Sequence, residues 1–348
     1  MKIHENLVAD SSGNRSGFAA HYRGLTRRDF IRDAALGAGV GLALGQREAS
    51  SQEARASKSK VVLVRDENVL DDNHQVDEAA VGAMLRRAMQ LVTGEDDSKK
   101  AWGRFVKPTD IVGIKANVMI TPTKPELLRA IIRELQGMGV PGDNIYTWDR
   151  VSYGVGLEGA DPKKRKGRCT FDSRGFSTLA TEKCTVLLNV PGTKVHGLSG
   201  VGIAVKNWVG GITFKELPIS RNRNAAYFGL HVDSCADLAK LCWIPEIREK
   251  CKLNIVEAFR PLFHGGPQVD PKYLWDYKGL LVSEDPVAVD IVCAKMLQAK
   301  RDEYRGEHWP IEPPIKHLLM ADSKYNLGIS DLSRIELVKE GYQEGVLV

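Results

Sequence analysis

The sequence predicts an α/β protein: a mainly parallel or mixed sheet with flanking helices, in a single continuous domain that covers residues 58–348. Strand and helix patterns alternate over residues 110–149, as they do in parallel sheets joined by helical crossovers. Short apolar runs recur further along the chain and indicate buried strands. No internal repeat or low-complexity tract divides this region, which favours one domain over two.

The first half of the domain carries the alternating pattern. We expect its elements at residues 60–64 (strand), 76–92 (helix), 94–100 (polar loop), 110–117 (strand), 124–138 (helix) and 144–149 (strand). Thr123 is the expected cap of the second helix, because its hydroxyl can accept from a backbone N–H of the first turn. Pro125 and Glu126 suit that first turn, where a proline needs no N–H and an acid favours the positive end of the helix.

The second half begins with residues 151–176, which are rich in Gly and charge and predict a long irregular insert. Further strands are expected at residues 185–190, 253–258 and 279–283, which are apolar runs of strand length. A helix over residues 286–298 follows the last of them. Asp285 stands directly before it as the expected cap.

The N-terminal segment resembles a twin-arginine (Tat) export signal. Arg27 and Arg28 stand together two residues before Phe30, and a mild apolar stretch follows over residues 34–45. That stretch is too short for a membrane span, which needs about 20 apolar residues, but it suits a signal sequence. A cleavage site is expected at residues 54–56 (Ala-Arg-Ala), with Ala49 as another possible end.

Residues 1–57 are therefore expected to be a Tat signal peptide and linker. The resemblance implies that the Tat translocase is a partner during export and that the mature chain is periplasmic or extracellular. It also raises the expectation of a cofactor, because Tat carries folded proteins. The alternative is a cytosolic protein with an arginine-containing tail. After residue 60 no stretch is long and apolar enough to span a membrane.

The charge and the cysteines exclude several classes of protein. The whole chain carries a net charge of +5, and the part after residue 56 has 41 Lys and Arg against 38 Asp and Glu. This is too mild for a dedicated nucleic-acid binder, and the basic run at 163–168 is interpreted as a solvated loop. None of the six cysteines forms a C-x-x-C pair, so an iron–sulfur or zinc-ribbon site is not indicated. Cys235, Cys242 and Cys251 could include a disulfide or be buried free thiols.

The polar residues that follow predicted strands indicate where a ligand would bind. In open α/β sheets, ligands bind at the carboxyl ends of the strands. Lys115 and Asn117 end one strand, Asp149 and Arg150 end another, and Asn189 ends a third. Residues 189–211 then place two lysines, a histidine and two asparagines among six glycines. Exposed backbone N–H groups and lysines suit an anion such as a phosphate or carboxylate, although neither a Walker A loop nor a dinucleotide fingerprint is present.

Histidines and carboxylates elsewhere in the chain suggest a second possibility. His231 and His264 could join His196 at a divalent metal, since imidazole and carboxylate ligands suit Zn, Fe, Ni or Mn. Asp290 stands on an apolar helix face and needs a partner or a function. The alternatives are a structural hydrogen bond for each histidine and a helix cap for Asp285. His74, His308 and His317 have no neighbours in the sequence that indicate a functional site, so they are not counted as candidates.

Several segments together resemble the DUF362 family. Residues 194–200 and 205–210 resemble its K-x-H and K-N-x-x-G core, and residues 114–117, 253–258, 265–267 and 283–290 resemble further elements in the same order. The resemblance covers about residues 58–340. Glu257 stands where the family usually has Asp, and the cysteine clusters of some relatives are absent, so no iron–sulfur role is implied. The family implies the fold and the site but no settled reaction.

These observations predict an exported enzyme that carries out a redox or isomerisation reaction on a small anionic substrate with a bound metal or cofactor of unknown identity. The expected catalytic residues are Lys194, His196, Lys206, His231 and Asp290; the expected ligand-binding residues are Lys115, Asn117, Asn207, Gly210, Gly211 and Asp285; and the expected metal ligands are His196, His231 and His264. The imidazoles would move protons. The alternatives are a non-catalytic ligand or metal carrier, and a purely structural protein without a convergent polar cleft.

Overall fold

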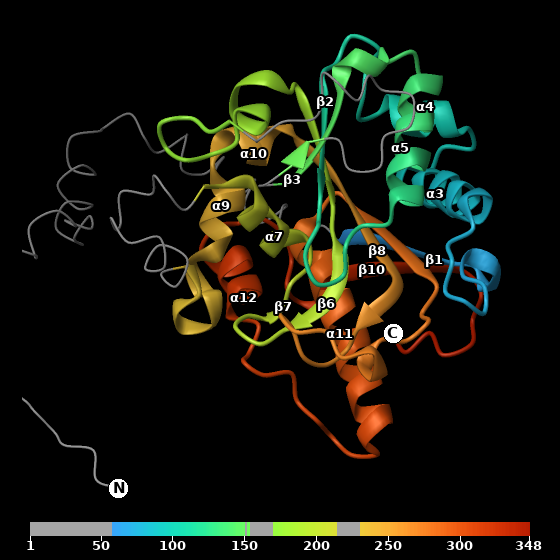
Figure 1. Cartoon of the computed structure of the whole chain (residues 1–348), viewed down its shortest axis with the longest axis vertical. Helices are drawn as coiled ribbons and strands as arrows, with labels where there is room; N and C mark the ends of the chain where they lie inside the picture. Colours follow the sequence, from blue (N-terminus) through green and yellow to red (C-terminus); the bar gives the residue numbers. More distant parts are fainter. Residues whose placement is uncertain (1–57, 150–151, 154–169, 214–229) are drawn as a thin grey trace, which may run out of the picture. The chain divides into compact units, whose positions relative to one another are not determined.

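A mixed sheet forms the centre of the described structure, with its strands in the order β10-β1-β9-β8-β5-β2-β3-β4, and with β6 paired to both β7 and β8 (Figure 1). The computed structural model describes residues 58–149, 152–153, 170–213 and 230–348. Its strands are β1 (Ser59–Arg65), β2 (Val112–Ala116), β3 (Ile145–Asp149), β4 (Ser152–Tyr153), β5 (Val186–Val190), β6 (Gly192–His196), β7 (Gly200–Val201), β8 (Cys251–Leu262), β9 (Gly279–Ser283) and β10 (Ile335–Gly341).

The sheet has a parallel half and a half that contains an antiparallel strand. The neighbouring strands β3, β2, β5 and β8 all run in the same direction. Strand β9 runs against both β8 and β1, whereas β10 is parallel to β1. The predicted α/β class with a mainly parallel or mixed sheet is therefore confirmed. Because β2, β3 and β5 share a direction, their carboxyl ends meet at one edge of the sheet, where polar side chains from all three can gather.

Helices cover both faces of the sheet, which explains why its strands read as continuous apolar runs. Successive residues of a strand point to opposite faces, so Val61 and Leu63 of β1 pack into one core, and Val62 and Val64 into the other. The helices are α3 (Glu78–Thr93), α4 (Ser98–Gly103), α5 (Pro125–Gly137), α7 (Ala204–Asn207), α9 (Lys240–Trp243), α10 (Pro245–Lys250), α11 (Pro286–Arg305) and α12 (Lys316–Ser323). Buried side chains of α3, α4 and α5 form one core, and those of the later helices form the other.

The strong sequence patterns match observed elements closely. The strand predicted at 279–283 has those bounds, and the helix predicted at 286–298 begins at Pro286 and continues to Arg305. Asp285 caps it as expected, because its carboxylate accepts from the N–H groups of Val287 and Ala288 at 2.8 Å. Asp285 therefore lies at the start of α11, where its oxygens accept hydrogen bonds from backbone N–H groups.

The prediction that Thr123 caps α5 is wrong. The residue before the helix is Lys124, which makes no side-chain cap, while Pro125 and Glu126 do lie in the first turn. The Thr123 hydroxyl instead donates to the Val190 carbonyl at 2.6 Å and accepts from Asn117 N–H. It thereby ties the end of β2 to the end of β5, a tertiary contact that no local pattern contains.

Weak patterns account for the elements that the sequence did not reveal. The expected polar loop at 94–100 contains the start of α4, which Asp97 caps and whose Ala101 and Trp102 are buried. Strand β6 has the sequence Gly-Thr-Lys-Val-His, which shows no apolar run. Strand β10 lies at the edge of the sheet beside β1, and most of its side chains are exposed or half-buried.

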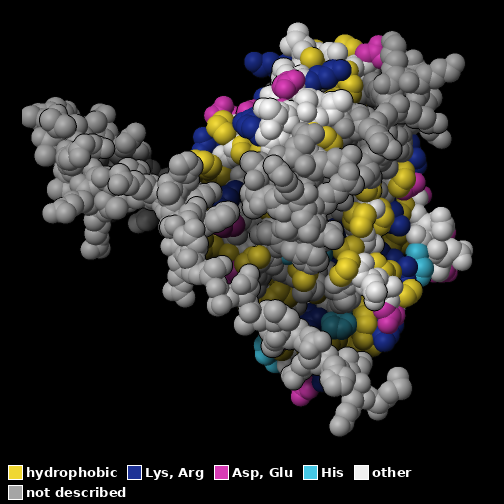
Figure 2. All heavy atoms as spheres, turned by 60° about the vertical axis from the view of Figure 1, so that its left-hand side comes forward, with side chains coloured by type: hydrophobic (Ala, Val, Ile, Leu, Met, Phe, Trp, Pro, Cys, Tyr) yellow, Lys and Arg dark blue, Asp and Glu magenta, His cyan; other side chains and the backbone are white. Residues whose placement is uncertain are grey.

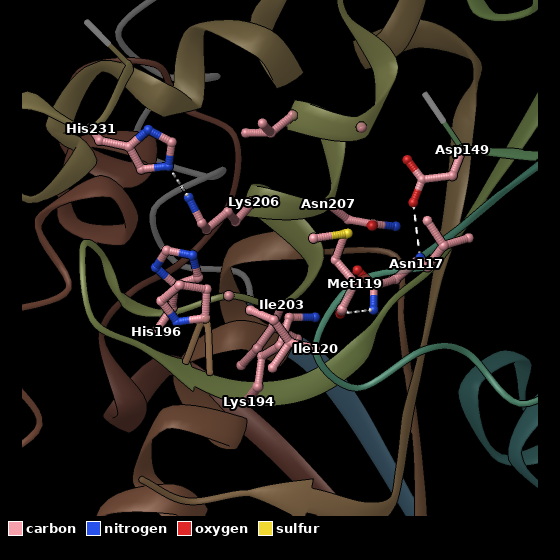
Figure 3. A pocket seen from close by; sticks show the side chains of 15 residues that line it. Asn117, Met119, Ile120, Asp149, Lys194, His196, Ile203, Lys206, Asn207 and His231 are labelled. Carbon is pink, nitrogen blue, oxygen red and sulfur yellow. Dashed lines mark hydrogen bonds between the residues drawn. The ribbon is translucent and has the colours of Figure 1, made fainter. Parts of the chain in front are cut away.

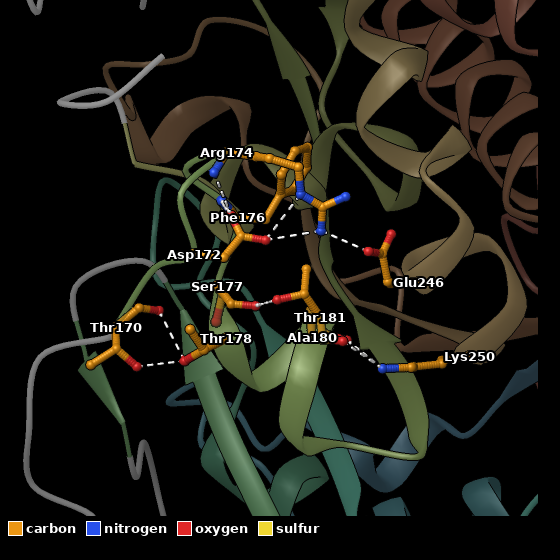
Figure 4. A network of polar contacts seen from close by, with 10 residues as sticks. All are labelled: Thr170, Asp172, Arg174, Phe176, Ser177, Thr178, Ala180, Thr181, Glu246 and Lys250. Atoms are coloured by element: carbon orange, nitrogen blue, oxygen red, sulfur yellow. Dashed lines mark hydrogen bonds and ion pairs between the residues drawn. The ribbon is translucent and has the colours of Figure 1, made fainter. Parts of the chain in front are cut away.

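A polar network holds the segment after residue 170 against α10 (Figure 4). Arg174 donates to Asp172 at 2.9 Å and to Glu246 at 2.6 Å. The Lys250 ammonium donates to the carbonyls of Ala180 and Thr181 at 3.1 and 3.0 Å. This segment belongs to the predicted irregular insert, so part of that insert is fixed by ion pairs and backbone contacts.

Several predictions fall outside the described residues: the export signal and its cleavage site, Arg150, the basic run at 163–168, Cys169 and most of the insert.

Where the structure is described, it contains no helix long and apolar enough to cross a membrane. On the face drawn in Figure 2, basic and acidic side chains are interspersed. The five described cysteines are free, so Cys235, Cys242 and Cys251 form no disulfide with one another.

Candidate functional site

A pocket of about 200 Å³ lies where the carboxyl ends of β2, β3 and β5 meet the loop and helix that follow β6 (Figure 3). It is lined by Asn117, Val118, Met119, Ile120, Asp149, Lys194, His196, Gly202, Ile203, Lys206, Asn207, Val209, Gly210, His231 and Pro267. Residues up to 150 positions apart in the sequence therefore contribute to one cavity. The location agrees with the general tendency of open α/β sheets to bind ligands at this edge.

Helix α7, which carries Lys206 and Asn207, is held in place by a carboxylate from another helix. Asp290 of α11 accepts from the N–H of Ala204 at 2.7 Å and from the N–H of Val205 at 3.0 Å. Asp290 is fully buried, and burial raises its pKa to about 8 against the opposing effect of these two N–H groups. It therefore caps the first turn of α7 from behind, because the residue before the helix offers no side-chain cap.

A chain of buried amides fixes the other end of α7. The Asn207 amide donates to the Lys115 carbonyl at 3.1 Å and to the Asn189 side chain at 2.8 Å. Asn189 in turn donates to the Ala204 carbonyl and to the Asn254 side chain, both at 2.9 Å. Buried amides keep their positions only when their hydrogen bonds are made, so this chain locks α7 to β2, β5 and β8.

Lys206 and His231 form a hydrogen-bonded pair on the wall of the pocket. The Lys206 Nζ lies 2.9 Å from Nε2 of His231 and 3.9 Å from Sγ of Cys235. Burial lowers the pKa of Lys206 to about 8, although the Cys235 thiol opposes the shift. Figure 3 shows the amine pointing at the imidazole, with His196 beside the pair. A lysine with a pKa near neutrality that is hydrogen-bonded to an imidazole can give or take a proton.

His196 is a neutral hydrogen-bond donor in this setting. Burial, followed by the positive charge of Lys206 and the neighbouring His231, lowers the pKa of His196 to about 3. The two imidazole rings are stacked, with centroids 6.0 Å apart. The N–H of Leu198 donates to Nδ1 of His196 at 3.2 Å. A neutral imidazole that accepts at Nδ1 carries its proton on Nε2, so His196 offers an N–H rather than a base.

Lys194 lies on β6 at the floor of the same pocket. Its Nζ donates to the Gly192 carbonyl at 3.4 Å, a long hydrogen bond. Burial is the main cause that lowers the pKa of Lys194 to about 7. Both lysine side chains pass close to Gly202, since a Cβ built on Gly202 would lie 3.4 Å from Cδ of Lys206 and 3.6 Å from Cε of Lys194.

Lys115 and Asp149 form a buried ion pair beneath the pocket. The Lys115 Nζ lies 3.4 Å from Oδ1 of Asp149 and donates to the Ala116 carbonyl at 2.6 Å and to Oδ1 of Asn207 at 3.3 Å. The other Asp149 oxygen accepts from the N–H of Val118 at 2.9 Å. Lys115 is fully buried, so it braces the pocket wall and is covered by other residues.

The structure brings most of the expected site residues together. Lys194, His196, Lys206, His231, Asn117, Asn207 and Gly210 line the pocket, with Lys115 directly behind it. Gly211 packs against the rings of Trp148 and Trp208 instead. Asp285 and Asp290 serve as helix caps, as described above, so neither carboxylate lines the pocket. Their positions therefore do not support the expected catalytic role of Asp290 or the expected ligand-binding role of Asp285.

The three histidines expected at a metal do not converge. His264 contacts Arg301, whose Nη1 lies 2.9 Å from its Nδ1, and its ring packs on Tyr273 and Trp309. The guanidinium donates to Nδ1 of His264, so the lone pair of that nitrogen is not available to a cation. Among the described residues no group of three or more His, Cys, Asp or Glu side chains could hold a metal ion.

Sequence reasoning missed several residues of the pocket. Met119 and Ile120 follow β2 and supply apolar lining, but two apolar residues in a loop carry no pattern. Asp149 was marked only as the end of a strand. His317 of α12 was set aside, yet it is buried near the site, and burial followed by the charge of Lys206 lowers its pKa to about 3. Only the fold brings these residues to the lysines.

A family model for a domain of unknown function (DUF362) matches residues 106–295 of the chain. The match begins before β2 and ends within α11, so it includes all the side chains that line the pocket. No curated protein and no solved structure shows significant similarity to the chain.

Proposed function

The chain belongs to the DUF362 family, whose function is unknown, and from the chemistry of its pocket we propose that it is an enzyme that binds a small organic anion and moves a proton on it. The convergence of Lys194, Lys206, His196 and His231 on one cavity supports this proposal. Two amines and an imidazole N–H that belong to residues lining one cavity are hydrogen-bond donors, which stabilise negative charge on a ligand.

The apolar part of the lining favours an organic ligand over an inorganic anion. Met119, Ile120, Ile203, Val209 and Pro267 line the cavity together with the basic residues. Pockets for small molecules commonly combine apolar walls with a few polar groups that fix orientation. A carboxylate would meet the lysines while a short carbon chain contacts these side chains. The cavity volume of about 200 Å³ is sufficient for a small organic molecule.

The pair of Lys206 and His231 supports proton transfer as the chemistry. A group is most useful as an acid or base when its pKa lies near the working pH, and the pKa values of Lys206 and Lys194 are about 8 and about 7. Of the reaction classes expected from the sequence, isomerisation by proton transfer is the one these side chains serve directly. A redox reaction would also need a bound electron carrier.

Calorimetry with a small carboxylate tests this proposal. Lactate is expected to bind the wild-type chain, and Lys206→Met to weaken binding about 100-fold, because the buried ammonium that faces the carboxylate is lost. Methionine has a similar length and no charge to bury, so the variant is expected to remain folded. The control is Lys252→Met, which removes an exposed lysine. Equal affinities for all three proteins, or no binding to any, would contradict the proposal.

Export by the Tat route is part of the proposed function. It is supported by Arg27, Arg28 and Phe30 and by the apolar stretch at 34–45. In a bacterium with a Tat system, Arg27→Lys with Arg28→Lys is expected to leave the protein in the cytoplasmic fraction, whereas Arg15→Lys with Arg23→Lys is expected to be exported like wild type. Cell fractionation with immunoblotting measures this. An identical distribution of both double variants would remove export from the proposal.

A further inference from the structure

We propose that Lys194 is a nucleophile that forms an imine with its substrate, and that the small organic anion is therefore a 2-oxo acid. This inference rests on the proposed function, because it assigns a substrate class to the same pocket. It goes further in giving the two lysines different tasks: Lys206 binds the carboxylate, and Lys194 attacks the neighbouring carbonyl carbon.

The two lysine side chains lie side by side across Gly202. The position of a Cβ on Gly202 is 3.4 Å from Cδ of Lys206, 3.6 Å from Cε of Lys194 and 3.6 Å from Cβ of His196. All three side chains line the pocket, and Lys194 and Lys206 are only 6% and 9% exposed, respectively. Because both lysines line one pocket, we expect a ligand with two adjacent polar groups, such as a carboxylate and a carbonyl on neighbouring carbons, to contact both amines.

The hydrogen bonds separate the roles of the two amines. Lys206 is oriented by His231 at 2.9 Å and also contacts Cys235, which suits a fixed cation that holds a carboxylate. In the part of the chain that the structure describes, Lys194 donates a single long hydrogen bond, to the Gly192 carbonyl. Its amine is thus weakly engaged, which leaves its lone pair free to attack once the nitrogen is deprotonated.

The charges around Lys194 keep part of this amine neutral. Burial lowers its pKa to about 7, and the positive charges of Lys115 and Lys206 act in the same direction. Asp149 and Glu257 oppose the shift, and Asp290 is a further carboxyl group that interacts with Lys194. An amine with a pKa of about 7 is half deprotonated at neutral pH. Desolvation and a second cation are the two means by which enzymes activate a lysine for imine formation.

The reaction balances with groups that the pocket and the substrate supply. The neutral Lys194 nitrogen forms a bond to C2 of the oxo acid, and the carbonyl electron pair moves to oxygen. That oxygen takes up the two protons which the nitrogen loses and leaves as water, so amine and ketone become imine and water. Protonation of the imine from solvent or from Lys206 gives an iminium ion. The N–H on Nε2 of His196 can donate to the oxygen while it carries negative charge.

Reductive trapping tests the inference directly. The full-length protein is incubated with pyruvate and cyanoborohydride, which delivers a hydride to the iminium carbon and leaves a stable secondary amine. Intact-mass spectrometry is expected to show one added group per chain, and peptide mapping is expected to place it on Lys194. The adduct is expected to be lost in Lys194→Arg and retained in Lys252→Met, whose lysine is exposed. Glyoxylate serves as a second oxo acid.

Lactate separates failure of this inference from failure of the proposed function, because it has the same carbon skeleton as pyruvate but a hydroxyl in place of the carbonyl at C2. If lactate and pyruvate both bind and neither oxo acid leaves an adduct on Lys194, the imine is excluded while the anion pocket stands. An adduct on Lys206 would overturn the assignment of roles. If neither pyruvate nor lactate binds, the proposed function fails and the inference fails with it.

Discussion

Replacing Gly210 with alanine is expected to lower the free energy of unfolding by about 3 kcal/mol. The new Cβ would lie 2.6 Å from Nζ of Lys115 and even closer to Oδ1 of Asp149. Real Cβ atoms do not approach other heavy atoms this closely, so both side chains would have to move. Both atoms belong to the buried ion pair beneath the pocket. Forcing them apart leaves two charges poorly paired away from water, which is costly.

Gly202→Ala is the matched control for this variant, because it adds the same methyl group to the same segment. Its Cβ would meet Lys206, His196 and Lys194 at 3.4 to 3.6 Å, which is ordinary van der Waals contact. We expect a change of less than about 1 kcal/mol in the free energy of unfolding. Denaturant titrations measure both variants. Equal stability of the two would show that the ion pair does not constrain Gly210.

Above pH 8, anion binding is expected to weaken as the pH rises. Each increase of one pH unit lowers the affinity about tenfold for every proton that is taken up on binding. The pKa values of Lys194 and Lys206 in the empty pocket are about 7 and about 8. A bound carboxylate favours the charged form of both amines and raises their pKa values. Protons are therefore taken up on binding at pH 8 to 9, and the affinity falls as the pH rises through this range.

The same two lysines predict the opposite pH trend for the stability of the unliganded protein. Their pKa values are lowered on folding, so the unfolded chain binds more protons than the native protein between about pH 7 and the ordinary lysine pKa of 10.5. Their contribution to stability is unfavourable below this window and is relieved as the pH rises. The difference in unfolding free energy between wild type and Lys206→Met, followed as a function of pH, gives the contribution of Lys206 to this trend.

Calorimetry of lactate binding from pH 6 to pH 9.5, in buffers of different ionisation enthalpy, measures affinity and proton uptake together. Lys252→Met serves again as the control, with the pH profile of wild type expected. A flat affinity profile, or release of protons at pH 8 to 9, would show that the lysines do not change their charge on binding. It would also remove the electrostatic basis for their role in the pocket.

The elements that local pattern predicted best were those buried on both sides. Residues 279–283 form a wholly buried strand between β1 and β8, so their apolar run alone marks β9. Polar strand β6 and edge strand β10 lack such a run and were not predicted. The direction of β9 against its neighbours was also beyond local pattern, because the pairing of strands depends on segments far apart in the chain.

By itself, the sequence determined the fold class, the helix that Asp285 caps and the glycine-rich segment with its lysines and histidine. These depend on periodicity and on neighbouring residues, which a linear chain displays. Only the tertiary structure decided that Lys206 meets His231, that Asp290 caps α7 and that His264 lies against Arg301. These contacts join residues between 25 and 86 positions apart, and their geometry arises from the packing of helices on a sheet, which no local pattern encodes.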